Sequence, residues 1–171
     1  MIEITGDLFK QKADVLCITT NGYVKANGEN VMGMGCAKRA AEINKTVPLL
    51  LGKAIKLHGN RVNHIITEKV ALYSFPVKPI TAICLPDKSN IVGYMKSKVR
   101  AGESVMGWAC KADIGQILKS AKEIVELANE HGWKKVVIPR PGCGAGELDW
   151  NQLAPQLEKI LDDRFYLITF K

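Results

Sequence analysis

Short apolar runs alternate along the chain with amphipathic segments of helical period. The run from Val15 to Ile18 is continuously apolar, which is typical of a strand covered on both faces. The other expected strands lie at 2–5, 62–67, 70–75, 80–85, 135–139 and 165–170, and the expected helices at 37–44, 49–57, 114–131 and 152–161. Because strands and helices alternate, the pattern predicts an α/β fold with a mostly parallel central sheet.

Two connections that lead into expected helices are rich in glycine. Their glycines are Gly33 and Gly35 in the first connection and Gly142, Gly144 and Gly146 in the second. Glycine reaches left-handed conformations at little cost, and its N–H groups can line a concavity that accepts phosphate oxygens near a helix start. The loops therefore indicate a nucleotide or phosphate site. A tight strand-to-helix turn is the alternative, although such a turn needs only one glycine.

The position of such a site follows from the sheet. Ligands of parallel α/β sheets bind outside the carboxyl ends of the strands. The loops after the strands at 15–18, 80–85 and 135–139 are then expected to converge on one cleft, with Asn21 and Lys88 near the second glycine loop. This arrangement requires those three strands to be parallel.

Several common classes of site are disfavoured by the motifs. The chain has neither a Gly-x-Gly-x-x-Gly nor a P-loop signature, no Gly-x-Ser-x-Gly elbow, and no histidine close to Cys143 in sequence. Its five cysteines are scattered and it has only three histidines, so neither a disulfide framework nor a zinc site is expected. We expect no metal and no cofactor.

Length and composition suit one domain: the chain has 171 residues, of which 47% are hydrophobic. No apolar run reaches the roughly 18 residues of a membrane span, and the first residues do not resemble a signal peptide. We therefore expect a cytoplasmic protein that makes no membrane contact.

The formal net charge of +7 favours polyanionic partners. Part of the excess lies in a basic insertion at about 88–111, where Glu103 is the only acidic residue and Tyr94 and Trp108 are interleaved. The basic residues of the insertion are Lys88, Lys96, Lys98, Arg100 and Lys111. A solvated surface loop and a flap that contacts nucleic acid are both compatible with this pattern.

Four segments together resemble the macrodomain family of ADP-ribose-binding modules, and the resemblance covers most of the chain. They lie at 6–8, 13–21, 31–37 and 139–150. The last segment, Pro-Arg-Pro-Gly-Cys-Gly-Ala-Gly-Glu-Leu-Asp-Trp, is similar to a loop of the branch that contains terminal ADP-ribose glycohydrolase and the antitoxin macrodomains that remove ADP-ribose from DNA bases. The resemblance implies a single macrodomain over residues 1–171, with three layers and a mixed, mostly parallel sheet between helices.

The resemblance also implies which residues bind ligand. Asp7 would accept from the adenine amino group, Asn21 would lie at the distal ribose, and the two glycine loops would wrap the diphosphate and that ribose. For Asp7 and Asn21, a turn-forming role is the alternative. The implied ligand-binding residues are Asp7, Leu8, Thr20, Asn21, Met32, Gly33, Met34, Gly35, Cys36, Pro141, Gly142, Cys143, Gly144, Ala145 and Gly146.

The candidate catalytic residue is Lys88. In the branch that this chain resembles, a nucleophilic lysine follows a Phe-Pro-Thr-type strand end, and the segment 85–88, Leu-Pro-Asp-Lys, is similar to it. Its neutral amine would attack the anomeric carbon, which requires burial or nearby cations to lower the lysine pKa. An ordinary solvated lysine is the alternative. Gly146 stands where terminal ADP-ribose glycohydrolase carries an aspartate, which favours the branch that acts on DNA.

Two main functions follow from the resemblance. The first is hydrolysis that removes ADP-ribose from a macromolecule, either a DNA base or an acidic side chain, or from a related derivative. The second is a non-catalytic module that binds ADP-ribose or a related nucleotide signal. A basic nucleic-acid-binding domain with an idle cleft is a third alternative. Glu147, at the cleft rim, is either a general base or a solvated loop residue.

Overall fold

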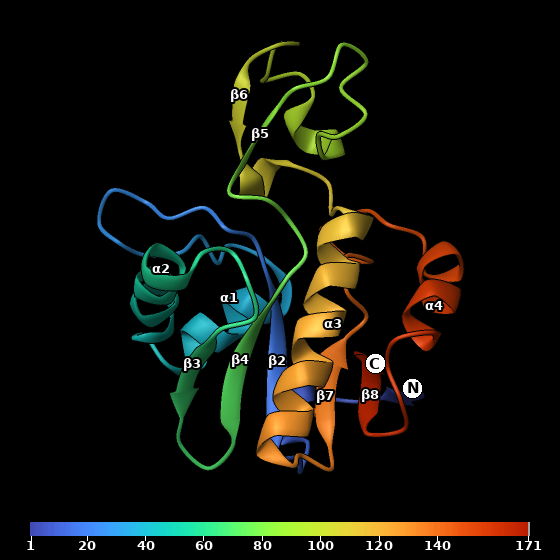
Figure 1. Cartoon of the computed structure of the whole chain (residues 1–171). Helices are drawn as coiled ribbons and strands as arrows, with labels where there is room; N and C mark the ends of the chain where they lie inside the picture. Colours follow the sequence, from blue (N-terminus) through green and yellow to red (C-terminus); the bar gives the residue numbers. More distant parts are fainter. Residues whose placement is uncertain (171) are drawn as a thin grey trace.

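A six-stranded sheet in the order β1-β8-β7-β2-β4-β3 forms the centre of the protein (Figure 1). In this computed structural model, which describes residues 1–170, β3 is antiparallel to β4 and all other neighbours are parallel. The strands are β1 (Ile2–Thr5), β2 (Val15–Thr20), β3 (His64–Thr67), β4 (Ala71–Pro76), β7 (Val136–Pro139) and β8 (Phe165–Thr169). The predicted mixed, mostly parallel sheet is confirmed.

Helices cover both faces of this sheet. The helices α1 (Gly35–Ile43) and α2 (Val47–His58) pack on one face, and α3 (Ile114–His131) and α4 (Trp150–Glu158) pack on the other. Alternate residues of β2 enter the two cores, Val15 and Cys17 on the α3 side and Leu16 and Ile18 on the α1 side. This explains the continuous apolar run and confirms the three-layer α/β architecture. No helix in residues 1–170 is long and apolar enough to cross a membrane.

The segment between β4 and α3 leaves the sheet and forms a separate small unit, which we call the β5–β6 arm (residues 79–111). In it, β5 (Thr81–Ile83) pairs with β6 (Ser104–Met106), and the short helices η2 (Gly93–Met95) and η3 (Gly107–Ala109) complete the unit. Its own core consists of Cys84, Ile91, Val99, Val105, Ala109 and Cys110. The arm projects beyond the carboxyl ends of the central strands (Figure 1).

The prediction that 80–85 is a strand of the parallel sheet is therefore wrong. The strand next to β2 is β4, and within the described chain β5 pairs with β6 alone. The apolar residues of the run serve the arm instead: Cys84 is buried in the core of the arm, whereas Ile80 and Ile83 are 46% and 57% exposed. The strands that converge on one edge are β2, β4 and β7.

Candidate functional site

A cavity of about 540 Å³ lies at the carboxyl ends of β2, β4 and β7. Both glycine loops line it, with Met32 to Cys36 on one side and Gly142, Gly144, Ala145 and Gly146 on the other. A smaller cavity of about 330 Å³ adjoins it. The two share Gly35, Cys36, Pro139 and Phe170, so they form one continuous groove.

The first loop presents the N-terminus of α1 to the groove. The N-cap residue, Met34, makes no side-chain hydrogen bond to the N–H groups of the first turn. Cys36 fixes the loop to β2, because its Sγ lies 3.4 Å from the Thr19 nitrogen and 3.3 Å from the Thr19 Oγ1. Burial raises the pKa of the Cys36 thiol. A helix N-terminus of this kind favours a bound anion.

Two kinds of glycine line the groove. Gly142 has a φ of 74°, and a Cβ on Gly146 would lie 2.5 Å from the Gly142 carbonyl oxygen, so the packing of the loop requires both. At Gly33 and Gly144 a Cβ would meet no atom within 4 Å, and neither has a left-handed φ. The fold itself therefore does not require glycine at these two positions, although their missing side chains keep the groove open.

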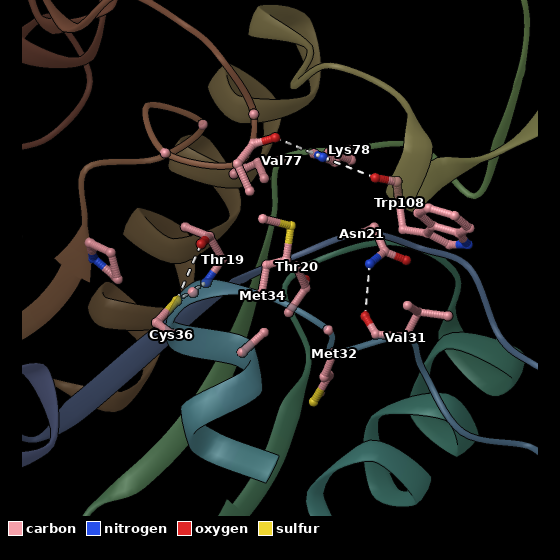
Figure 2. A pocket seen from close by; sticks show the side chains of 18 of the residues that line it. Thr19, Thr20, Asn21, Val31, Met32, Met34, Cys36, Val77, Lys78 and Trp108 are labelled. Atoms are coloured by element: carbon pink, nitrogen blue, oxygen red, sulfur yellow. Dashed lines mark hydrogen bonds between the residues drawn. The ribbon is translucent and has the colours of Figure 1, made fainter. Parts of the chain in front are cut away.

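The end of β2 supplies the floor of the larger cavity. The Asn21 amide donates to the Val31 carbonyl at 2.8 Å (Figure 2). Its oxygen accepts from the Tyr23 N–H at 2.9 Å. Asn21 therefore holds the segment that leads to the first glycine loop. Thr20 lines the cavity, and its buried hydroxyl has no hydrogen-bond partner within residues 1–170.

Lys78 lies two residues after β4 and is only 7% exposed. Its amine lines the cavity and donates to the Trp108 and Ala145 carbonyls, each at 3.1 Å (Figure 2). No ion pair of the described residues includes it. Burial lowers the pKa of Lys78, although Cys110 and Glu147 partly oppose the shift. This is a desolvated amine on the wall of the cavity.

Lys88 occupies a different place. It lies in the β5–β6 arm and is not among the residues that line either cavity. Its Nζ donates to the Lys96 carbonyl at 2.8 Å, within the arm. The expectation that Lys88 faces the cleft fails because its segment does not follow a strand of the central sheet.

The smaller cavity is lined by apolar and cationic groups. Leu8 and Phe9 form one wall, and the Arg39 guanidinium lies 5.4 Å from the centre of the Phe9 ring and 5.9 Å from that of Phe170. Asp7 accepts from the Phe9 N–H at 3.0 Å and pairs with Arg39 at 2.6 Å. The hydrogen bond from Arg39 is the main reason that the pKa of the Asp7 carboxyl is lowered. Asp7 thus borders this cavity as an ionised acceptor.

Among residues 1–170, no cluster of three or more His, Cys, Asp or Glu is placed to hold a metal ion.

Neither a protein-family model nor a curated protein matches the sequence. Solved structures, however, do match. The macrodomain of Mycobacterium tuberculosis DarG is 18% identical, with a TM-score of 0.70 over 99% of this chain and 95% of that one. This chain has the macrodomain fold.

Two further macrodomain structures agree. The macrodomain of Thermus aquaticus DarG is 15% identical, with a TM-score of 0.68 over 99% of this chain and 97% of that one. Thermosipho africanus DarTG in complex with ADP-ribose is 18% identical, with a TM-score of 0.69, and the match covers 99% of this chain and 42% of that one.

Most of the predicted ligand-binding residues meet in the groove that the two cavities form, which we call the macrodomain groove. Those that line it are Leu8, Thr20, Asn21, Met32, Gly33, Met34, Gly35, Cys36, Gly142, Gly144, Ala145 and Gly146. Asp7, Pro141 and Cys143 lie beside the groove without lining it. Cys143 donates to the Pro141 carbonyl at 3.5 Å, and burial raises the pKa of its thiol, which does not suit a nucleophile.

Several residues that line the macrodomain groove were not predicted from the sequence. They are Phe9, Arg39, Lys78, Tyr94, Trp108, Arg140 and Phe170. A signal for Lys78 was present: the segment 75–78, Phe-Pro-Val-Lys, is also a strand end that runs through proline to lysine. Trp108 and Tyr94 had no such signal, because their positions depend on how the arm packs against the two glycine loops.

Proposed function

We propose that the groove binds ADP-ribose and that Lys78 cleaves the bond between the terminal ribose and an attached group. The observation that carries the proposal is the buried Lys78 amine beside two glycine loops and an uncapped helix N-terminus. The Thermosipho africanus neighbour, whose structure contains ADP-ribose, supports the choice of ligand.

The groove suits the parts of ADP-ribose in order. The adenine would occupy the smaller cavity between Leu8, Phe9 and Phe170, where a flat ring contacts apolar side chains. The diphosphate would accept from the N–H groups that begin α1, where the helix dipole stabilises negative charge. The terminal ribose would then reach Thr20 and Lys78.

The hydrogen bonds of Lys78 suit a neutral amine. A neutral amine has two N–H donors, and the Trp108 and Ala145 carbonyls accept both, so its lone pair is left for the cavity. The ammonium form carries a third proton, for which the described residues provide no carboxylate partner. Lys78 is the lysine that we assign as nucleophile, in place of Lys88.

The chemical step follows from this lone pair. The Lys78 nitrogen forms a bond to the anomeric carbon while the bond to the attached group breaks, and the leaving atom keeps the electron pair and takes up a proton. Water then adds at the same carbon, the carbon–nitrogen bond breaks, and the free amine and ADP-ribose are restored.

We propose a nucleic acid as the carrier of the ADP-ribose. The β5–β6 arm has five basic and two acidic residues and supplies Tyr94 and Trp108 to the larger cavity. Positive charge beside aromatic rings suits a single-stranded polyanion whose bases can stack. An acidic side chain of a protein is the other carrier, and a module that binds without cleaving is the alternative function.

The test uses calorimetry and turnover together. Wild-type protein is titrated with ADP-ribose and is then incubated with an oligonucleotide and with a peptide, each carrying ADP-ribose. Binding and release of free ADP-ribose by the wild type, with binding but no release by Lys78→Met, support the proposal. Binding with no release from any substrate supports the binding module instead. Absence of ADP-ribose binding rejects both.

A further inference from the structure

Two consecutive residues of the β5–β6 arm, Gly93 and Tyr94, contact both loops that border the larger cavity. The Gly93 N–H donates to both carboxylate oxygens of Glu147, at 3.1 and 2.9 Å. The Tyr94 hydroxyl lies 3.8 Å from the Met34 sulfur on the opposite side, and Tyr94 lines the cavity. These residues therefore connect the second glycine loop to the first across the mouth of the cavity.

Glu147 holds its position against the preference of its own backbone. Its φ is 61°, in the left-handed region that residues with a Cβ rarely adopt. Glycine would adopt this conformation more readily. The Glu147 side chain does not line the cavity, and the contact with Gly93 is its hydrogen bond to the arm. The conformation thus puts the carboxylate where it can hold the arm.

We infer that Glu147 is a positioning residue that fixes Tyr94 as the outer wall of the subsite for the group attached to ADP-ribose, and that this wall favours a planar heterocycle over an aliphatic group. The inference rests on the proposed function. Lys78 lies on the arm side of the cavity, bonded to the Trp108 carbonyl, so a group attached at the reacting carbon lies near the arm. A flat ring can stack on Tyr94, whereas an aliphatic ester has no face to stack.

Glu147 also carries a charge that acts on Lys78, and this effect must be separated from positioning. Its carboxylate is one of the groups that oppose the lowering of the Lys78 pKa. Glu147→Gln removes the charge but keeps an oxygen that accepts from Gly93, whereas Glu147→Gly removes both and relieves the left-handed backbone. Tyr94→Ala and Tyr94→Phe form a second pair that leaves Glu147 unchanged.

The experiment measures dissociation constants in a Lys78→Met background, in which no substrate is consumed. The probes are ADP-ribose linked to a base of an oligonucleotide, ADP-ribose linked to a glutamate of a peptide, and free ADP-ribose. Glu147→Gly and Tyr94→Ala should each weaken the base-linked probe about fivefold to tenfold, the size expected for one charge-assisted hydrogen bond or one stacking contact. The glutamate-linked probe should change less than about twofold.

Two further readouts distinguish positioning from general loss of structure. Glu147→Gln and Tyr94→Phe should recover most of the affinity for the base-linked probe. Hydrogen exchange at the Gly93 amide should be faster in Glu147→Gly than in Glu147→Gln, because only the latter keeps an acceptor for that N–H. Equal weakening of both conjugates, or no weakening of the base-linked probe in either Glu147→Gly or Tyr94→Ala, overturns the inference. If the wild-type protein does not bind free ADP-ribose, the proposed function is overturned instead.

Discussion

Two segments of this chain run through proline to lysine, 75–78 and 85–88, and the structure places them in opposite environments. Lys78 follows β4 of the central sheet, is 7% exposed and lines the larger cavity. Lys88 lies ten residues later, in the β5–β6 arm, and its amine bonds to the Lys96 carbonyl. The short motif is the same in outline, so the strand order decides which lysine meets the glycine loops.

Burial changes the chemistry of the Lys78 amine. The pKa of Lys78 is lowered mainly because its charged form loses solvation, which makes the neutral amine accessible at a lower pH. A sequence motif identifies a lysine as a candidate nucleophile. Whether its amine can react depends on desolvation, which lowers its pKa, and on the hydrogen bonds that orient its lone pair.

The largest difference should come from removing each amine while keeping its aliphatic stem. Lys78→Met should slow release of ADP-ribose about 1,000-fold or more, the scale typical of losing a nucleophile. Lys88→Met should change the rate by less than about twofold. Single-turnover assays with thermal melting of both variants check this. Equal loss in both variants, or loss in Lys88→Met alone, would contradict our assignment.

Alanine substitutions at two glycines of the second loop should have different effects, one on ligand affinity and the other on the free energy of unfolding. Gly144→Ala should weaken ADP-ribose binding about tenfold and change the free energy of unfolding by less than about 0.5 kcal/mol, because its Cβ meets only open groove. Gly146→Ala should lower the free energy of unfolding by about 2 kcal/mol, because its Cβ would lie 2.5 Å from the Gly142 oxygen. Calorimetry and denaturant melts give the two quantities. If Gly144→Ala destabilised as much as Gly146→Ala, the distinction between the two kinds of glycine would be lost.

The basic residues of the arm should contribute to the binding of the nucleic-acid carrier but not to the binding of free ADP-ribose. Replacing Lys96, Lys98 and Arg100 by alanine should weaken binding of an ADP-ribosylated oligonucleotide about fivefold and reduce the dependence of that binding on salt. Binding of free ADP-ribose should stay within about twofold, since none of the three lines the groove. Titrations at several salt concentrations test this, with Lys45, Lys53 and Lys56 replaced by alanine as the control for net charge. If the salt dependence did not change, the arm would not be part of the proposed nucleic-acid interface.

The pH dependence should report Lys78 directly. The rate should rise with pH as the amine loses its proton, and the midpoint should lie below the 10.5 of an ordinary lysine because burial lowers the pKa. The measurement is kcat/KM against pH in the wild type. A midpoint at or above 10.5 would contradict a desolvated nucleophile at Lys78.

The parts of the molecule that local sequence determines were predicted well. The apolar run of β2 reflects burial on both faces. The helix α3 has the predicted bounds of 114–131; Asp113 caps its start by accepting from the Gln116 N–H at 2.8 Å, and Gly132 follows its end. The two glycine loops were also found, because a turn or an open groove requires glycine whatever lies elsewhere. These features depend on a few neighbouring residues.

The features that were not predicted from the sequence depend on contacts between distant segments. The run at 80–85 has the composition of a central strand, but its partner is β6 and not β2, and only the full sheet decides this. The same expectation placed Lys88 at the cleft, whereas Lys88 lies in the β5–β6 arm and does not line either cavity. Likewise, Phe9, Arg39 and Phe170 come from three elements, and their meeting in the smaller cavity has no local signal.

The most direct test of the central claim is to trap the covalent adduct that the proposed mechanism requires. The wild-type protein is mixed with ADP-ribosylated oligonucleotide in the presence of cyanoborohydride, and the modified peptide is identified by mass spectrometry. The bond between the lysine nitrogen and the anomeric carbon becomes an imine when the ribose ring oxygen leaves that carbon, and cyanoborohydride reduces this imine to a stable amine. We predict that the adduct lies on Lys78 and is lost in Lys78→Met but kept in Lys88→Met. An adduct on Lys88, or continued turnover by Lys78→Met, would contradict it.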